Sequence, residues 1–358
     1  MALVVVCKPS VSLRRFLRYV LFASTLIAAV LARPAAACTV STSFSSNLGT
    51  YSPAAVKAKA VPTIKSRAGL QCNSALLVLL SDDNIKAKFS SQNGLKLLAT
   101  SGVFSVGYKA SADPSGTFAF SQNSTIDYMQ NNLLNLLGLL GSSSADLPFF
   151  ITPNEALFPP EGVYKDRITI FWSWKICPSG ISLLGACVGG AESGTGTSVI
   201  DVTLNVAAQN PTISILSTST WDPVDGTSRP KALPGAKRRV TMTVVNPDIV
   251  PLDVGAVIVV VPSPVGTAIA LDGDGASGGS AITIAEGSPA STLTMRYSGP
   301  DDMTDDVDFS SDAGQSWSYA PIVGNAVSQS AVTHVRIRAR GTMAKQSTFS
   351  VSVPYLIR

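Results

Sequence analysis

The sequence predicts an all-β protein made of two β-sandwich domains in tandem. Of its 358 residues, 46% are hydrophobic and only 14% are charged, so there is ample apolar material for a core. The 28 Gly and 22 Pro interrupt the chain too often for long helices. Apolar and polar residues alternate with a period of two in both halves, which is typical of strands with one buried face. The length favours about two domains.

The first 37 residues have the pattern of a secretory signal peptide. A basic region that includes Arg14 and Arg18 precedes an apolar run at residues 19–31, and small residues at 35–37 mark a cleavage site before Cys38. The apolar run is too short to span a membrane, so we expect no transmembrane span once the leader is removed. The expected location is secreted, in a periplasm and at the cell surface.

Removing this leader changes the charge balance. Its five basic residues leave with it, and 22 basic and 23 acidic residues remain. The remaining chain has no excess of positive charge, so nothing indicates a nucleic-acid partner.

Four cysteines remain after Cys7 leaves with the leader, and they are Cys38, Cys72, Cys177 and Cys187. An even number in an oxidising compartment favours two disulfides. Neighbourhood in the sequence suggests that Cys38 pairs with Cys72 and Cys177 with Cys187. The alternative for Cys38 is a lipidated N-terminus, because small residues precede it.

Residues 162–177 predict a long central strand. Ile168, Ile170 and Trp172 fall on one face and the residues between them on the other. A hairpin between Cys177 and Cys187 follows. Residues 198–207 alternate in the same way and predict a closing edge strand with one solvated side.

A leucine-rich segment at residues 128–140 has two interpretations. One is a short core helix or a segment that crosses between strands, since leucines are usually buried. The other is an exposed apolar loop that adheres to surfaces. The candidate adhesive residues are Leu136, Leu137, Leu139 and Leu140.

The composition changes near Asn210 and Pro211, and no cysteine follows. We therefore divide the chain into a leader at 1–37, a first domain at 38–208 and a second at 209–358. The second domain should be a β-sandwich. Its expected strands are residues 213–217, 238–246, 254–261, 280–284, 292–297, 307–310, 316–319, 333–340 and 348–357.

Several short motifs stand out in the first half: CTVST from Cys38, NLGTYSP at 47–53, Gln71-Cys72, GVYKDRITIFW at 162–172, the WSWKIC…GACVG hairpin, and VIDVTLNV. Together they resemble the spore coat protein U family, the secreted subunits of archaic chaperone-usher pili and related coats. The resemblance covers about residues 38–208, but residues 82–157 do not align and Leu48 stands where the family often has phenylalanine.

This resemblance implies an immunoglobulin-like subunit whose partners are a periplasmic chaperone, an usher and other pilus-like subunits. In such assemblies a donor strand from one protein completes the sheet of another. The mature chain is expected to begin directly with its first cysteine strand. Such a subunit would accept a neighbour's strand without donating one at its N-terminus, which suits a tip position.

The second half is similar to a bacterial surface repeat domain of unknown role, again a sandwich module. The matching residues are DPVDGTSRPKALPGAKRRVTMTVVN at 222–246. Asp225, Arg229 and Leu233 depart from the repeat's pattern. Both domains are thus expected to be immunoglobulin-like.

The sequence offers little material for catalysis. Its single histidine, His334, is expected on a solvated strand face with Arg336, Arg338 and Arg340, so a hydrolase triad is not expected. Residues 310–317, SSDAGQSW, match an Asp-box hairpin. One copy cannot build a propeller, so this motif predicts a structural turn capped by Asp312.

Acidic residues suggest one weak metal candidate. Asp272 and Asp274 resemble the start of a calcium loop, but the further acids that such a loop requires are missing. The nearby acidic cluster at residues 301–308 offers an alternative place for a weakly bound Ca²⁺, but a solvated loop is the simpler interpretation. We expect no cofactor and no metal.

Together these observations predict a non-enzymatic, exported subunit of a pilus-like or coat-like surface assembly, with a tip or adhesive role. The alternative is a secreted carbohydrate- or protein-binding module without a pilus role.

Overall fold

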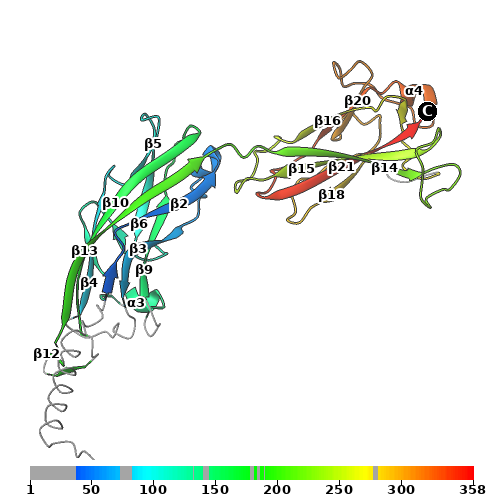
Figure 1. Cartoon of the computed structure of the whole chain (residues 1–358). Coiled ribbons are helices and arrows are strands. Elements are labelled where there is room, and N and C mark those ends of the chain that lie inside the picture. The colour runs from blue at the N-terminus through cyan, green and yellow to red at the C-terminus, as the bar shows by residue number, and fades with distance from the viewer. Residues whose placement is uncertain are drawn as a thin grey trace, which may run out of the picture.

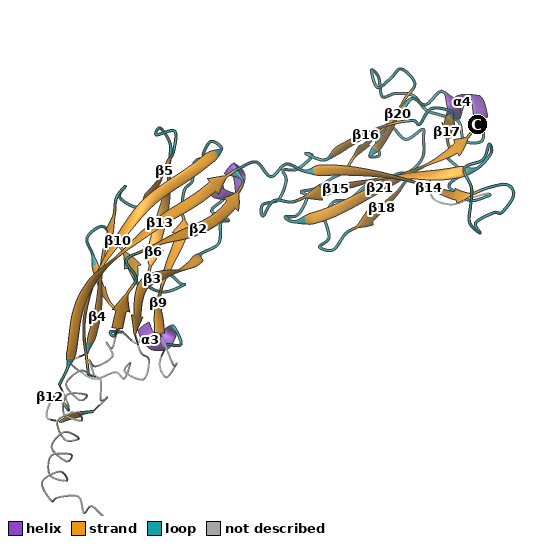
Figure 2. Ribbon diagram, in the orientation of Figure 1, coloured by secondary structure: helices purple, strands orange, loops and turns teal. Residues whose placement is uncertain are grey.

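The computed structural model describes residues 38–72, 83–131, 133–139, 145–177, 181–183, 186–188, 190–276 and 281–358. Nearly all regular structure in these ranges is strand, which confirms the all-β prediction (Figure 2). Its helices are short: α2 (Pro53–Lys57), α3 (Leu133–Leu136) and α4 (Ala326–Ser330). The expected signal peptide at 1–37 lies outside the described residues, as does the continuous apolar run at residues 76–80, whose sequence predicts a buried strand.

Buried apolar residues form two separate clusters, one within residues 38–206 and one within residues 240–355. We call residues 38–206 the first module and residues 212–357 the second module (Figure 1). No helix in the described ranges has the length and apolar character needed to cross a membrane.

The first module is a sheet that folds over its own core, with main strand order β1-β3-β9-β6-β5-β10-β13-β2. Strands β4, β7 and β8 attach beside this path, and β11 and β12 form a separate small hairpin. The strands are β1 (Cys38–Val40), β2 (Ser43–Tyr51), β3 (Ile64–Cys72), β4 (Asn84–Ser91), β5 (Lys96–Ala99), β6 (Ser105–Ser111), β7 (Ala119–Phe120), β8 (Thr125–Asp127), β9 (Ala145–Pro153), β10 (Gly162–Ile176), β11 (Ser182–Leu183), β12 (Ala186–Cys187) and β13 (Glu192–Val206).

The predicted central strand is β10. Its alternate residues Ile168, Ile170 and Trp172 are buried, as expected. The Trp172 ring lies 5.7 Å from that of Tyr128, and its Nε1 donates to the carbonyl of Ala68 at 3.2 Å. One face of β10 thus anchors the core.

The expectation that residues 198–207 form an edge strand is wrong. β13 pairs with β10 on one side and in parallel with β2 on the other. Its alternation arises because one face meets the core and the other faces solvent, and this pattern does not reveal whether a strand lies at an edge.

The segment that contains β1 and β2 crosses the core, from the side of the folded sheet that contains β3 to the side that contains β13. β1 pairs with β3, the Ser41 amide donates to the Gly69 carbonyl at 2.7 Å, and β2 then joins β13. Gly69 has a φ of +86°, and a Cβ there would lie 2.3 Å from the Ser198 hydroxyl oxygen. This crossing therefore requires a glycine.

Disulfides join Cys38 to Cys72 and Cys177 to Cys187, the pairing expected from their neighbourhood in the sequence. The first ties the start of β1 to the end of β3. Because the Cys38 sulfur is part of this bond, it is not available for the lipid attachment considered as an alternative.

The second module has one sheet in the order β14-β15-β21-β17, with β18 also on β21, and a second sheet in the order β16-β20-β19. Two expected strands, at 292–297 and 316–319, are absent from the described ladders and make only isolated bridges. The strands are β14 (Thr212–Trp221), β15 (Lys237–Asn246), β16 (Ile258–Pro262), β17 (Thr267–Ile269), β18 (Thr283–Glu286), β19 (Val307–Ser310), β20 (His334–Arg338) and β21 (Ser347–Ile357).

Candidate strand-acceptor groove

The crossing of the first segment leaves part of β3 without a neighbour. β9 pairs with β3 on one side from Ile64 to Arg67. On the other side, β1 covers only Leu70 to Cys72. No described strand pairs with the Ile64–Arg67 part of β3 on that side, so this part presents an open backbone edge.

The register shows which backbone groups face outward. Arg67 lies opposite Pro148, which has no N–H, and the Pro148 carbonyl accepts from the Tyr128 hydroxyl at 2.9 Å. This is therefore a non-hydrogen-bonded pair of the antiparallel ladder. The backbone groups of Lys65 and Arg67 point away from β9, whereas those of Ser66 point toward it.

The open edge borders a groove of about 450 Å³ between the two layers. Most of its lining residues carry hydroxyl, amide or charged groups, and Ile64 and Pro148 are the aliphatic members. The lining residues are Ser45, Ser46 and Asn47 of β2, Ile64, Lys65, Ser66 and Arg67 of β3, and Asp146 and Pro148 of β9.

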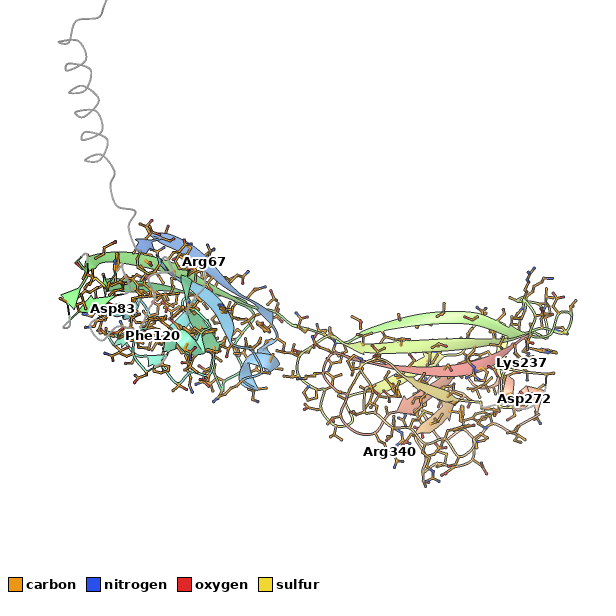
Figure 3. The ribbon with its side chains drawn as sticks, turned by 90° about the horizontal axis from the view of Figure 1, so that it is seen from below. Arg67, Asp83, Phe120, Lys237, Asp272 and Arg340 are labelled. Atoms are coloured by element: carbon orange, nitrogen blue, oxygen red, sulfur yellow. A yellow bond between two sulfur atoms is a disulfide. The ribbon has the colours of Figure 1, made fainter. Side chains whose placement is uncertain are left out.

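An ion pair marks one side of this groove. Arg67 Nε lies 2.8 Å from Asp146, and the Arg67 side chain is largely exposed (Figure 3). Burial raises the pKa of Asp146 above its ordinary value, although the positive charges of Arg67 and Lys65 act to lower it. The groove thus offers main-chain partners and polar walls, which suit an extended peptide.

The proposed adhesive leucines separate into different environments. Leu136 is 65% exposed, whereas Leu137 and Leu139 pack partly against the core. The expectation that these leucines form an exposed loop is therefore wrong for Leu137 and Leu139. Leu140 lies outside the described residues. The neighbouring Leu133 and Leu134 are buried, as the core-helix interpretation predicts for the segment.

Further exposed apolar side chains lie in the hairpin closed by Cys177 and Cys187. Ile181, Leu183 and Val188 are 57%, 66% and 41% exposed. Figure 1 places β12 and α3 at the same end of the first module. This end therefore carries apolar side chains from two segments.

The weak calcium candidate is occupied by protein cations. Asp272 accepts from Lys237 Nζ at 2.7 Å (Figure 3). Asp274 accepts from Arg239 Nε at 2.9 Å. No group of three or more metal-ligating side chains gathers in the described ranges. The sequence could not show these pairs, because the cations come from a distant strand.

The acidic cluster at 301–308 divides into two parts. Residues 301, 303 and 304 are exposed, as expected of a solvated loop. Asp306 and Asp308 are buried and form a network with arginines 336, 338 and 340, which corrects the solvated loop there and the solvated strand face. Asp308 is buried and accepts from Arg336 Nε at 2.8 Å and Arg338 Nε at 2.9 Å. Asp306 pairs with Arg340. The half-buried charges hold β19 and β20 together.

His334 lacks the surroundings of a catalytic histidine. It lies opposite Ser310, but the Ser310 hydroxyl donates to Asp312 at 2.7 Å, and Nδ1 of His334 is buried without a hydrogen-bond partner. A triad needs a carboxylate on that nitrogen. The Asp-box residues instead form the expected turn, in which Gly314 has a φ of +81°.

No motif in the sequence pointed to the Ile64–Arg67 edge. An open edge is defined by the strand that does not pair there, which leaves no chemical signature in the residues themselves.

No protein-family model matches the chain, and no curated protein sequence matches it. Among solved structures, it is similar to a chain of the pre-assembly complex of the chaperone CsuC with the tip adhesion subunit CsuE, from archaic chaperone-usher Csu pili of Acinetobacter baumannii. The identity is 15%, the match covers 88% of this chain and 99% of that chain, and the TM-score is 0.40.

A protein described as membrane anchored, from Corynebacterium diphtheriae, is 10% identical. That match covers 89% of this chain and 50% of that chain, with a TM-score of 0.21. At such identities and TM-scores these likenesses carry no argument about what this chain does.

Proposed function

We propose that this chain is a non-enzymatic, exported subunit of a pilus-like or coat-like surface assembly, which accepts a β-strand from a neighbour. The observation that carries the proposal is the open β3 edge from Ile64 to Arg67 beside the groove. The motifs that resemble the spore coat protein U family support it. The partners would be a periplasmic chaperone, an usher and other subunits.

The groove defines the strand it would take. The backbone of Lys65 and Arg67 supplies one edge of hydrogen-bonding groups, and Ser45 and Asn47 add polar side chains across the groove. A strand with hydroxyl or amide side chains facing these walls fits best, because buried polar groups require hydrogen-bond partners.

Residue-resolved amide hydrogen exchange tests the proposal. The chain is co-expressed with a candidate periplasmic chaperone, and exchange is compared in the recovered complex and the free chain. We expect slower exchange at Lys65 and Arg67, whose N–H groups face the groove. Ser66 is the matched internal control, because its N–H faces β9 and should not change.

Two results contradict the proposal in different ways. A complex in which Lys65 and Arg67 exchange as in the free chain would place the contact elsewhere. The absence of any complex with chaperones or subunits would favour the secreted binding module instead.

We further propose that the end of the first module carrying α3 and β12 is an adhesive tip. The exposed side chains of Leu136, Ile181 and Leu183 support this role, because grouped apolar side chains on a surface mark contact sites. The Cys177–Cys187 bond restrains the hairpin that presents two of them.

Binding to alkyl-coated beads tests the tip. The double variant Leu136→Ser and Leu183→Ser should lose most of its binding, because the apolar contact area disappears. The control, Val103→Ser with Val265→Ser, removes two apolar side chains elsewhere that are even more exposed, and it should bind as the parent does. Equal losses in the two variants would exclude a specific tip.

A further inference from the structure

Strand β14 of the second module is an edge strand with unusual exposure. It pairs with β15 along its length and ends the sheet order, so in the described part of the chain its other edge has no strand neighbour. Residues 212–218 are exposed on both faces. Edge strands of this length normally carry protection against pairing with other chains.

The apolar residues of β14 continue the inner face of the sheet. Ile213 lies opposite Val244, and Ile215 lies opposite Met242. Opposed residues share a face, and Val244 and Met242 belong to the second core. Ile213 and Ile215 are nevertheless 57% and 66% exposed. The core-facing side of this sheet therefore extends beyond its covering layer.

The usual protective devices are missing from β14. Its sequence, TISILSTSTW, contains no charge and no proline. The β15 residues opposite 212–217 are uncharged as well. A partner selected by charge would find nothing to recognise here, whereas an identical strand meets no like-charge repulsion.

We propose that β14 pairs antiparallel with β14 of a second copy of this chain, joining the two sheets into one. A twofold axis makes such a contact self-complementary and closed. The proposal is independent of the strand-acceptor groove, which lies in the first module.

The exposed residues fix the register. Ile213 and Ile215 of the two copies lie on the same face of the joined sheet only if odd-numbered residues oppose odd-numbered residues. The reason is that the side-chain period of a strand is two. The midpoint of residues 212–218 is Ile215. Ile215 therefore opposes Ile215 of the second copy, and Ile213 opposes Ser217.

Sedimentation velocity of the full exported chain, up to about 100 µM, tests the pairing. We expect a dimer whose dissociation constant rises at least tenfold in Ile215→Lys, because two lysines would then face each other. Val265→Lys is the control, since Val265 is fully exposed in the same module but lies off β14. Near-ultraviolet circular dichroism checks that each variant is folded.

Cross-linking gives a second measurement. Ile215→Cys should form a covalent dimer under mild oxidation, whereas Val265→Cys should not. A chain that stays monomeric at every concentration would overturn the proposal. So would a dimer that Ile215→Lys leaves unchanged. Either result leaves the Lys65 and Arg67 exchange test unaffected.

Discussion

Single carboxylates in the second module serve as internal acceptors. Asp305 accepts the backbone N–H groups of Ser298 and Val307, and Asp306 accepts that of Arg296 at 2.7 Å. Buried carboxylates with such partners are stable because their desolvation is offset by charge-assisted hydrogen bonds. A run of aspartates thus has a structural use here that its composition does not reveal.

Asp312 provides a pH-dependent test of this principle. The hydroxyl of Ser310, and then that of Ser316, hold the pKa of Asp312 well below its ordinary value of 3.8. A depressed pKa means that the unfolded chain binds more protons, so the stabilisation is present above about pH 4 and is lost as pH falls through the folded pKa.

We therefore expect thermal unfolding of the second module to be less acid-sensitive in Asp312→Asn than in the parent between about pH 4 and 2. At pH 7 this variant should be less stable than the parent. Asp253→Asn, at an exposed carboxylate, serves as the control. An acid profile identical to that of the parent would contradict the role assigned to Asp312.

At the scale of elements, alternation predicted the longest strands and missed others for identifiable reasons. β10 was predicted because its β-branched and aromatic residues alternate without a break. β9 was not predicted, because Pro148 and Pro153 interrupt it. Pro148 is tolerated because it faces Arg67 at a non-hydrogen-bonded position.

The expected strand at 292–297 shows the opposite error. Its residues alternate, with Leu293 buried. The Arg296 amide, however, is bound by the Asp306 carboxylate rather than by a neighbouring strand. At this position a side chain, and not a neighbouring strand, accepts the backbone N–H. No local sequence pattern indicates this.

The sequence predicted that the chain accepts a strand, but it did not predict where the groove lies. The family resemblance implied an accepted strand, but the position of the open edge depends on where the chain crosses at Ser41 and Gly69. That crossing is set by the packing of Gly69 against Ser198, residues far apart in the sequence. Contacts of this range lie beyond periodicity arguments.

At the scale of the whole molecule, the separate cores and the position of both disulfides in the first module predict independent unfolding. Calorimetry should show two transitions, and replacing Cys38 and Cys72 by Ser should lower only one of them. With a sequence separation of 34 between these cysteines, the expected loss is about 3 to 4 kcal/mol.

Calorimetry distinguishes independent unfolding of the two modules from unfolding as one unit. A single transition that shifts as a unit would show that the modules unfold together, against the proposed division between residues 208 and 209. Limited proteolysis that releases an intact second module would agree with two transitions.

The parallel pairing of β2 with β13 affects how the protein is made. Ser43 pairs with Val199, so β2 cannot pair with β13 until almost the entire first module has been synthesised. Pairings between such distant segments form slowly, and unpaired edges attract wrong partners in the meantime. The edge of β2 therefore stays unpaired until β13 is available, and this interval sets the risk of misfolding.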